Sequence, residues 1–528
     1  MIKRAFRLIS LFAVIFFGPL AFALILSQEM SFLNWVLPVA AILWVALFGL
    51  WYLAYGQGRL RSRFRRLGLI LLGFILIGFI SSLLIRYEGS SSGSSFPRFS
   101  WVWQKSGSGK SAGINQTAPV TTGVSLSPDA PGATLVNFLG PDRDGMEDEL
   151  PFGTDWASHP PELVWRRPIG KAWSSFAVIG TKAITQQQVG DDELVTCIDL
   201  ATGRDLWNHT DRNTRLLLER AENSGGAMGG DGPRATPTIH EGKVYTMGGT
   251  GRINCLDLES GKALWSRNLI KDLGGVAQRW GMASAPLILP SRNCVVFAGP
   301  DVPGPTLIAC NLATGKDVWI YEGSGASYSS ARLLTLFGVE QIVTVNATDV
   351  SGVDPSTGKE LWKYPWPGFF PKVAQPLVYD GDKLLVTASY GVGSLLLQLS
   401  DKSGKIEVTQ LWKTTAMKTK FSSAAIIGDH AYGLDEGRFA CIDLKTGKRV
   451  WKNQKFGFGQ HLLFGDWLLV QAESGDVIIG TTSPESFVEK GRIPALTSMT
   501  WNVPTVAGRI LLVRNDLEAA CYLLPPKP

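Results

Sequence analysis

The sequence contains little cysteine, histidine or charge. Cysteine accounts for 6 of the 528 residues and histidine for 5. So few cysteines exclude a disulfide-rich scaffold. Because no Cys-x-x-Cys motif and no pair of histidines at ligand spacing occurs, we expect neither a metal site nor a c-type haem. Only 18% of the residues are charged and 45% are hydrophobic, which excludes a disordered chain.

Apolar residues are abundant near the start of the chain. Three uncharged apolar runs cover residues 8–26, 32–55 and 67–85 and hold 19, 24 and 19 residues. About 20 such residues cross a membrane as a helix, so the runs predict a membrane anchor of three transmembrane helices within residues 1–88. A cleaved signal peptide is the alternative for the first run. That run, however, exceeds the usual apolar core of ~7–15 residues and leads into the second run.

Basic residues flank these runs unevenly. Three precede the first run and five Arg lie between the second and third, whereas the loop between the first and second has Glu29 as its only charge. By the positive-inside rule the N-terminus is cytoplasmic, and everything after residue 85 lies outside the cytoplasm. We expect a multi-pass protein of the cell (inner) membrane, anchored in lipid, with its C-terminal part on the periplasmic or extracytoplasmic side.

The net charge of +6 does not predict a nucleic-acid partner. Residues 1–88 contain nine Lys and Arg against two Glu, so the remaining 440 residues carry a net charge of −1. Nucleic-acid binding needs a basic surface, which this larger part does not provide. Residues 89–133 are rich in Ser, Gly, Thr and Pro, a composition that predicts a flexible linker.

In residues 134–528 one phrase of nine residues repeats. It consists of Asp or Asn, two variable residues, Thr or Ser, Gly, Lys or Arg, two variable residues and Trp, apart from the looser copies. The complete copies contain Gly203, Gly261, Gly315, Gly358 and Gly447 and end at Trp207, Trp265, Trp319, Trp362 and Trp451. A looser copy reaches Trp412, and Trp165 lies on what resembles the final strand of a copy.

Each part of the phrase has a structural reason. Asp or Asn forms an Asx-type turn, Gly supplies a positive φ, and Trp fills the space between stacked sheets. Successive tryptophans lie 42, 58, 54, 43, 50 and 39 residues apart, which is typical of propeller blades of ~40–50 residues with four strands each. We predict an all-β fold, an eight-bladed β-propeller closed by the strand around Trp165. Seven blades is the alternative, because the seventh copy lacks both Gly and Trp.

The repeat also accounts for most of the cysteines. Cys197, Cys255, Cys310, Cys441 and Cys521 lie shortly before the turn, at what we interpret as one equivalent position. Equivalent positions on neighbouring blades are about 10 Å apart, too far for a disulfide. We expect these cysteines to be buried apolar side chains.

These phrases resemble the repeat of the pyrroloquinoline-quinone-like (PQQ-like) propeller family. The resemblance covers residues 135–525, and Phe138–Gly145 looks like a segment that precedes the blades in many members. The resemblance implies the propeller fold and leaves three functions open. The first is a non-catalytic binding or scaffold module with a protein, peptide or small-molecule ligand and no cofactor.

The second function is a quinoprotein alcohol or sugar dehydrogenase with PQQ and Ca²⁺. Membrane-bound sugar dehydrogenases of this family do have several N-terminal spans, but the adjacent cysteine pair of many alcohol dehydrogenases does not occur here. The third is an outer-membrane assembly scaffold. That lipoprotein is anchored through an N-terminal Cys, whereas the first Cys here is Cys197. We favour the first function and predict no catalytic residues.

A ligand of a propeller binds at the mouth of the central channel. Residues on the chain leading into the innermost strands are the candidates, although they can equally cap strands and fill the core. The predicted ligand funnel consists of Trp173, Arg234, Trp280, Tyr328, Gln375, Phe421, Asp435, Glu436 and Trp501. Asp435 and Glu436 form an acidic pair in a turn that suits either a cation or an exposed hairpin.

Overall fold

The computed structural model describes residues 59–90, 97–103, 119–122, 124, 126, 134–216, 230–301, 304–368 and 371–528. The chain divides into two compact units, one of residues 1–109 with 220–228 and the other of residues 110–219 with 229–528. In the first unit, helix α3 (Leu60–Leu84) leads into an antiparallel pair of strands, β1 (Ile85–Ser90) and β2 (Pro97–Trp101).

The predicted transmembrane helices fall on the first unit. The runs 8–26 and 32–55 lie outside the described residues, and the third run falls largely on α3. Within the described ranges, no helix is both long enough and apolar enough to cross a membrane. The three spanning helices are therefore not supported by the described residues and stay a prediction.

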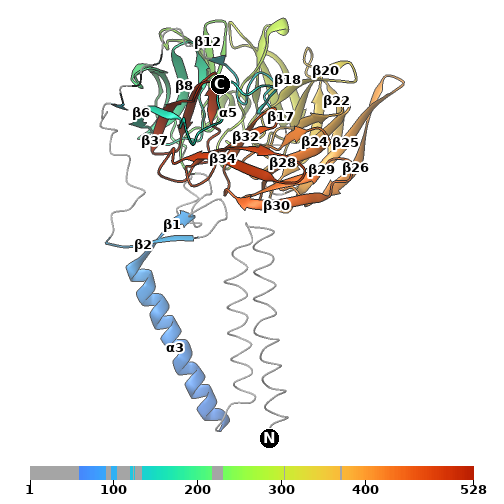
Figure 1. The fold of residues 1–528 in the computed structure, drawn as a ribbon. Helices are drawn as coiled ribbons and strands as arrows, with labels where there is room; N and C mark the ends of the chain where they lie inside the picture. Colours follow the sequence, from blue (N-terminus) through green and yellow to red (C-terminus); the bar gives the residue numbers. More distant parts are fainter. Residues whose placement is uncertain are drawn as a thin grey trace. The chain divides into compact units, whose positions relative to one another are not determined.

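The second unit is a propeller of eight sheets, which confirms eight blades over seven (Figure 1). In chain order, blade 1 consists of β7 (Ala177–Ile179), β8 (Lys182–Val189), β9 (Asp192–Asp199) and β10 (Asp205–Asp211), blade 2 of β11 (Thr238–His240), β12 (Lys243–Met247), β13 (Arg252–Asp257) and β14 (Ala263–Asn268), and blade 3 of β15 (Leu287–Leu289), β16 (Cys294–Ala298), β17 (Gly304–Asn311) and β18 (Asp317–Gly323). Blade 4 consists of β19 (Arg332–Leu336), β20 (Val339–Val345), β21 (Asp349–Val353) and β22 (Glu360–Pro365), blade 5 of β23 (Leu377–Tyr379), β24 (Lys383–Ala388), β25 (Gly393–Lys402) and β26 (Lys405–Thr414), and blade 6 of β27 (Ala425–Ile427), β28 (His430–Asp435), β29 (Arg438–Asp443) and β30 (Arg449–Lys455). Blade 7 consists of β31 (Gln460–Phe464), β32 (Trp467–Gln471), β33 (Val477–Thr482) and β34 (Phe487–Ile493), and blade 8 of β35 (Thr505–Ala507), β36 (Ile510–Arg514), β37 (Glu518–Leu523) and β6 (Glu162–Pro168). Short helices α5 (Leu269–Leu273) and η2 (Pro290–Arg292) lie in blades 2 and 3.

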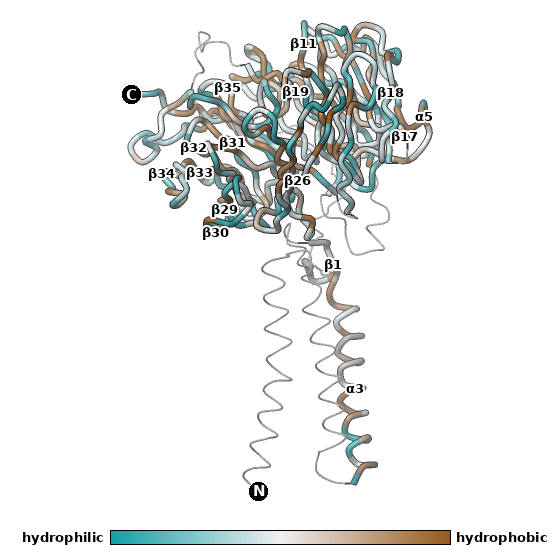
Figure 2. Tube along the Cα trace, turned by 90° about the vertical axis from the view of Figure 1, so that its right-hand side faces the viewer, coloured by the Kyte–Doolittle hydropathy of each residue, from teal (hydrophilic) through white to brown (hydrophobic). Residues whose placement is uncertain are grey.

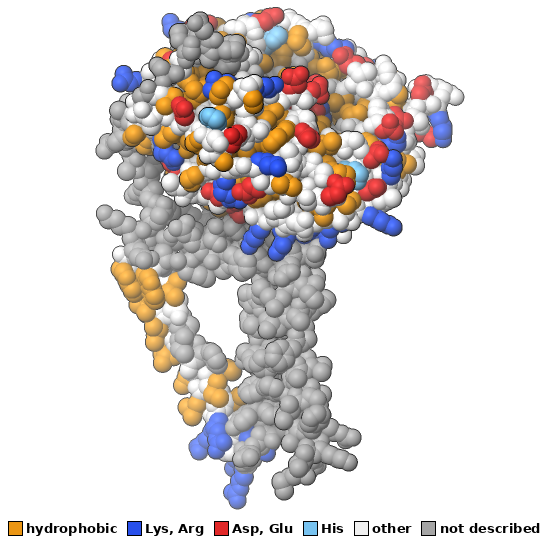
Figure 3. Space-filling view, in the orientation of Figure 1, with side chains coloured by type: hydrophobic (Ala, Val, Ile, Leu, Met, Phe, Trp, Pro, Cys, Tyr) orange, Lys and Arg blue, Asp and Glu red, His pale blue; other side chains and the backbone are white. Residues whose placement is uncertain are grey.

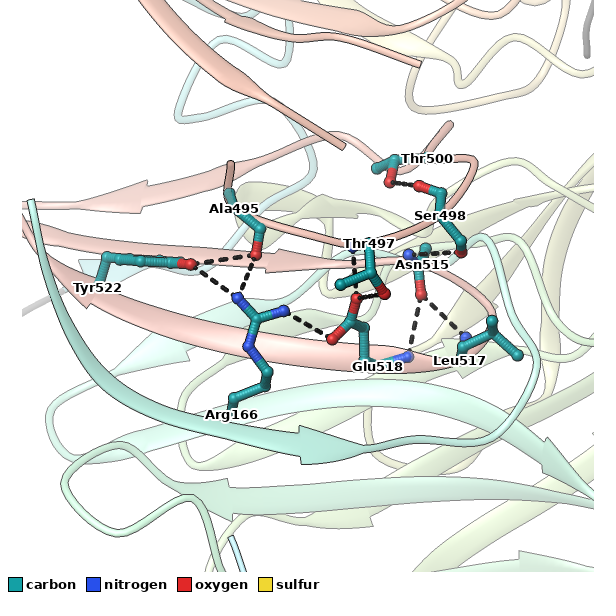
Figure 4. Close-up of polar contacts among 9 residues, drawn as sticks. All are labelled: Arg166, Ala495, Thr497, Ser498, Thr500, Asn515, Leu517, Glu518 and Tyr522. Carbon is teal, nitrogen blue, oxygen red and sulfur yellow. Dashed lines mark hydrogen bonds and ion pairs between the residues drawn. The ribbon is translucent and has the colours of Figure 1, made fainter. Parts of the chain in front are cut away.

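The ring closes where β6 pairs antiparallel with β37, near the C-terminus, as the sequence predicts. Trp165 lies opposite Cys521 in this pairing. Arg166 adds polar contacts, because its guanidinium lies 2.6 Å from Glu518 Oε2 and donates to Tyr522 Oη at 3.1 Å and to the Ala495 carbonyl at 2.9 Å (Figure 4). The closure is thus held by backbone pairing and by a charged network.

Three more strands from the N-terminal side complete the sheets. β3 (Val120–Thr121) pairs with β6 at the outer edge of blade 8, whereas β4 (Thr134–Leu135) and β5 (Met146–Glu147) extend the inner edges of blades 1 and 7. β2 and β3 fall within the segment that composition predicts to be a linker. Composition reports mean polarity and does not detect a short strand that pairs with a distant edge.

The repeated phrase locks each blade to the next. The amide of Thr202 donates to Asp199 Oδ1 at 2.8 Å, which is the predicted Asx turn, and Gly203 follows with φ +69°. The ring of Trp165, from the preceding blade, covers this glycine so closely that an added Cβ would lie 2.7 Å from Cδ2. Trp165 Nε1 also donates to the Leu200 carbonyl of the same turn at 2.8 Å.

The same contact recurs around the ring. The pairs that share it are Trp165–Gly203, Trp207–Gly261, Trp265–Gly315, Trp319–Gly358 and Trp412–Gly447. Trp451 keeps only the hydrogen bond, to the Ser483 carbonyl at 3.2 Å. Trp362 differs because its Nε1 donates to Gln341 of its own blade at 2.5 Å. The next turn, at Gly404, lies at the end of the longer β25–β26 hairpin and meets no side chain.

The seam between blades 7 and 8 obtains its indole from elsewhere in the chain. Gly491 pairs with Ile479 at the position where the outer strands of other blades have their Trp. The register of the pairing shifts next to this position, as it does next to the Trp in those blades. Trp156, from the segment before β6, packs on Gly491 and is 4% exposed. Phe152, nearby in the same segment, contacts Phe464 of blade 7 with ring centroids 5.9 Å apart. The N-terminal segment therefore replaces the side chain that the repeat lacks.

All six cysteines are buried and free. Cys197, Cys255, Cys441 and Cys521 lie opposite a Trp, as expected for one equivalent position. Cys310 does not share that position, because Ala309 lies opposite Trp319 and Cys310 lies opposite Asp317. The equivalence predicted for Cys310 is wrong by one residue, which places its side chain on the other face of the strand.

We predict that Gly315→Ala destabilises the propeller more than Gly404→Ala. Both glycines have positive φ, +69° and +82°, so both substitutions place a side chain in a disfavoured conformation. Only at Gly315 would the new Cβ also meet an indole, 2.7 Å from Trp265 Cδ2, whereas nothing lies within 4 Å of the Gly404 position. Thermal unfolding should show an additional loss of about 1–3 kcal/mol for Gly315→Ala. Equal losses would contradict the interlock.

Candidate functional site

Most of the predicted funnel residues lie at one end of the central channel, just before an innermost strand. Trp173 precedes β7, Trp280 precedes β15 and Phe421 precedes β27. Arg234, Tyr328 and Trp501 precede β11, β19 and β35 in the same way. Because every blade runs in the same direction, these positions share one mouth, which we call the channel mouth.

One side of the channel mouth is a stack of aromatic rings from blades 1, 6, 7 and 8. The ring centroids of Trp173 and Trp501 are 4.9 Å apart, and those of Trp501 and Phe421 are 4.7 Å apart. Phe421 also meets Phe458 edge-on at 6.2 Å. Trp501 is buried, whereas Trp173 and Phe421 are half-buried. Trp173 and Phe421 are therefore the rings of this group that solvent reaches.

The other side combines aromatic and cationic groups from blades 2 to 4. The rings of Trp280 and Tyr328 have centroids 5.8 Å apart, and Tyr328 Oη accepts a hydrogen bond from the Trp280 amide at 3.2 Å. The guanidinium of Arg279 lies 5.0 Å from the Trp280 ring centroid. Burial lowers the pKa of Arg234 to about 10, although Tyr328 and Asp231 oppose this shift. The side chain stays charged near neutral pH.

A buried lysine joins the aromatic stack, and the sequence analysis missed it. Lys420 Nζ lies 4.7 Å from the ring centroids of both Tyr390 and Phe458. Burial lowers its pKa to about 8, and the carboxylates of Glu436 and Glu473 oppose that shift. Phe458 precedes β31 as the other aromatic residues precede their strands, so the positional rule would have found it. Tyr390 and Glu473 lie in turns between middle strands, and no repeat signal indicates them.

Glu193, on β9, is a second group that the sequence did not indicate. It is 3% exposed and lies opposite Asp211 in the sheet. Its Oε1 accepts a hydrogen bond from the Gly249 amide at 3.0 Å, and its Oε2 has no hydrogen-bond partner. Burial raises the pKa of Glu193 to about 8, the Gly249 hydrogen bond opposes that shift, and the charge of Asp211 adds to it. Glu193 is therefore mostly protonated at neutral pH.

Gln375 contacts the N-terminal segment instead of a funnel. Its Oε1 accepts from the Ser330 amide at 2.8 Å, and its Nε2 donates to the Arg143 carbonyl at 3.3 Å. It is 2% exposed, so its observed role is to join blades 4 and 5 to that segment.

The segment of residues 134–147, which we call the plug, lies along the inner strands of the propeller. β4 and β5 pair with blades 1 and 7, and the Val136 carbonyl accepts from Ile239 of blade 2. Arg143 donates to the Ala285 and Pro286 carbonyls of blade 3, both at 2.8 Å. Arg332 of blade 4 lies 2.8 Å from Asp144 Oδ2. A hollow of about 410 Å³, with mostly apolar walls, remains beside this segment.

Asp435 and Glu436 are buried, at 0% and 7% exposure, so the predicted exposed hairpin turn is wrong. Asp435 lies 2.9–3.1 Å from Lys418, Arg449 and Lys452. Three cations around one carboxylate leave no need for a metal ion. Glu436 Oε1 accepts from Ser389 Oγ at 2.6 Å. Asp435 and Glu436 thus have structural partners within the protein. Sequence spacing cannot show these partners, because strand pairing brings them together. Across the described residues, no three His, Cys, Asp or Glu side chains converge to hold a metal.

The fold and its repeats define the class of protein. Eight blades form the ring, five of them contain a complete turn of the Asp-x-x-Thr-Gly-Lys-x-x-Trp type, and the final blade is closed by the N-terminal strand β6. The chain is an eight-bladed β-propeller built from repeats that resemble those of the PQQ-like family.

Comparisons with known proteins agree with this class. Residues 191–453 match the family model described as outer membrane protein assembly factor BamB. The outer membrane protein assembly factor BamB of Shewanella oneidensis is 22% identical over 247 residues, which cover 43% of this chain and 58% of that protein. The match thus spans little more than half of the curated relative.

Two solved structures share the fold at low sequence identity. A europium-containing methanol dehydrogenase has a TM-score of 0.55 and 12% identity, with 75% of this chain and 99% of that chain covered. The quinohemoprotein alcohol dehydrogenase of Comamonas testosteroni has a TM-score of 0.53 and 13% identity, with coverages of 75% and 81%. These values establish similarity of fold alone.

We predict that Glu193→Gln flattens the pH dependence of stability. Because the folded protein holds the Glu193 proton more tightly than the unfolded chain, the free energy of unfolding falls as the pH rises from about 4.5 to about 8. The slope is about 1.4 kcal/mol per pH unit. Melting temperatures measured across this range should show that the stability of the variant increases relative to that of the parent protein as the pH rises. Glu259→Gln, at an exposed turn, is the matched control, and parallel profiles for Glu193→Gln would contradict the prediction.

Proposed function

We propose that this protein is a non-catalytic binding module whose ligand docks at the channel mouth. The observation that carries the proposal is that the mouth combines half-buried aromatic rings with a carboxylate that is already hydrogen-bonded within the protein. Half-buried aromatic rings reach the surface beside Arg234, whose guanidinium also donates to the Gly230 and Gly232 carbonyls, and the nearby carboxylate of Glu473 is bonded within the protein. Glu473 accepts from Trp501 Nε1 at 2.8 Å and from the Phe458 amide at 3.3 Å. Such an arrangement suits the binding of a partner, because the carboxylate beside the aromatic rings already accepts hydrogen bonds from the protein.

The same geometry argues against the quinoprotein alternative. A flat quinone between two groups needs faces about 7 Å apart, twice the usual contact distance. The ring centroid of Trp501 lies 4.9 Å from that of Trp173 and 4.7 Å from that of Phe421, so a quinone does not fit between either pair. A calcium site also needs several convergent oxygen ligands, and among the described residues no three His, Cys, Asp or Glu side chains converge to supply them. We therefore rank PQQ with Ca²⁺ below a ligand that needs no cofactor.

A protein or peptide is the ligand that we favour. Aromatic and Arg side chains at a half-buried surface are the residues that dominate protein interfaces. The printed name of the curated relative, an outer membrane protein assembly factor, also favours a protein ligand. A role in outer-membrane assembly is the second candidate that this relative supports.

We propose further that the N-terminal region tethers the propeller to the cell membrane, with the propeller outside the cytoplasm. The three apolar runs and the basic residues beside them support this. Leu69, Leu72 and Leu83 on α3 are 59–69% exposed, and such apolar surface needs a partner. Figure 2 shows apolar residues along α3, and Figure 3 shows basic side chains near one end of it. On the face of the propeller that Figure 3 presents, acidic and basic side chains are interspersed.

We predict that the full-length protein neither binds PQQ nor oxidises alcohols or sugars. The purified protein in detergent should be titrated with PQQ and Ca²⁺, with binding read from the quinone absorbance and turnover from dye reduction. A quinoprotein alcohol dehydrogenase serves as the positive control. Dye-linked turnover that depends on PQQ would contradict the non-catalytic function.

We predict that the full-length protein remains in the membrane pellet after an alkaline carbonate wash. A Glu149→Cys variant reports the side of the membrane, because this side chain is exposed and all six native cysteines are buried. A membrane-impermeant maleimide should label the variant when the outer envelope is permeabilised and the inner membrane is intact. Release by the wash, or labelling only after lysis of the inner membrane, would contradict the tether or its orientation.

A further inference from the structure

The outermost strand of each blade carries a bulge at the residue before the repeat Trp. In the strand pairings the register shifts at this point, so the bulge residue has no direct partner. Seven of the eight bulge residues are aliphatic, namely Val164, Leu206, Leu264, Val318, Leu361, Leu411 and Val450; blade 7 has Lys490. Leu206, Leu264, Val318, Leu411 and Val450 are 45–52% exposed, whereas Val164 is 1% exposed.

Val164 is buried because another part of the chain covers it. β3 pairs antiparallel with β6, with Val120 opposite Arg166 and Thr121 opposite Trp165. The Thr122 amide donates to the Val164 carbonyl at 3.2 Å. Val124 and Leu126 then pack on the apolar cluster that contains Val164. An extended Val- and Thr-rich segment is therefore the ligand that this edge binds within the molecule.

Blade 3 presents an open edge suited to a similar segment. Its outermost strand, β18, ends the sheet and has no strand beyond it among the described residues. Val318 and Ile320 lie on one face of β18 and are 49% and 38% exposed. Glu322 follows on the same face and is exposed. The charge of Asp317, at the other end of β18, is neutralised by an ion pair with Arg267. The exposed Glu322 therefore makes its own end of the β18 edge negative.

We propose that the β18 edge binds an extended strand of a partner protein, rich in Val and Thr and with one basic residue. The partner strand adds to blade 3 as β3 adds to blade 8, through backbone hydrogen bonds and aliphatic packing. With the register of β3, its Val lies opposite Ile320, which is a favourable cross-strand pair. The residue two positions earlier lies opposite Glu322, where a Lys or Arg matches the charge. This surface is separate from the channel mouth and does not depend on a ligand there.

The test uses a labelled peptide that copies residues 118–126 with Ala118→Lys, which places a lysine opposite Glu322. Anisotropy with the full-length protein should show saturable binding below about 1 mM. Hydrogen exchange should show peptide-dependent protection at residues 317–323. Ile320→Asp and Glu322→Lys should each weaken binding about fivefold.

Matched controls separate edge binding from general adhesion. Leu206→Asp introduces the same charge at an exposed aliphatic side chain on the outer strand of blade 1 and should alter binding less than about twofold. The same peptide with Thr122→Pro lacks the backbone donor that corresponds to the Thr122 amide of β3 and should not bind. Unchanged melting temperatures verify that the exposed substitutions leave the fold intact. No saturable binding, equal effects of Ile320→Asp and Leu206→Asp, or protection confined to residues 162–168 would overturn the proposal.

Discussion

The contact on which the ring depends is that of an indole lying on a glycine of the next blade. It needs three features together: a Trp on the outer strand, an Asx turn in the neighbouring blade, and a Gly whose missing Cβ leaves room for the ring. The indole N–H also donates to a backbone carbonyl of that turn. Each blade thereby specifies the position of its neighbour, so local sequence repeats become a closed assembly.

Two seams without this contact show how the fold compensates. Between blades 4 and 5, Leu399, Ile406 and Val408 of the long β25–β26 hairpin belong to the same apolar cluster as Trp362 of blade 4. Between blades 7 and 8, Trp156 replaces the absent indole. The plug crosses the inner strands, so the channel mouth is built on blades held at both their outer and inner edges. A mouth held in this way can present preorganised binding groups.

The sequence predicts much of the fold because the repeat is local and periodic. Trp165 even predicts the closing strand, since an unattached final strand needs a partner at the other end of the chain. Contacts outside the repeat could not be foreseen. In the sequence, Asp435 and Glu436 resemble an exposed acidic turn. In the structure, strand pairing places three cations around Asp435. Likewise, Tyr390 joins the channel mouth only because distant blades converge there. Six funnel residues lie at the mouth as expected, while their role in binding stays a prediction.

The Trp156–Gly491 contact has a consequence for how the protein is made. Ribosomes synthesise the plug, β3, Trp156 and β6 first, and their partners in blades 7 and 8 last. During most of translation these early segments have no docking surface, and the apolar face of Trp156 stays uncovered. Contacts between residues so far apart in the chain form slowly, and exposed apolar segments aggregate. The early segments are therefore open to aggregation until the last strand is available.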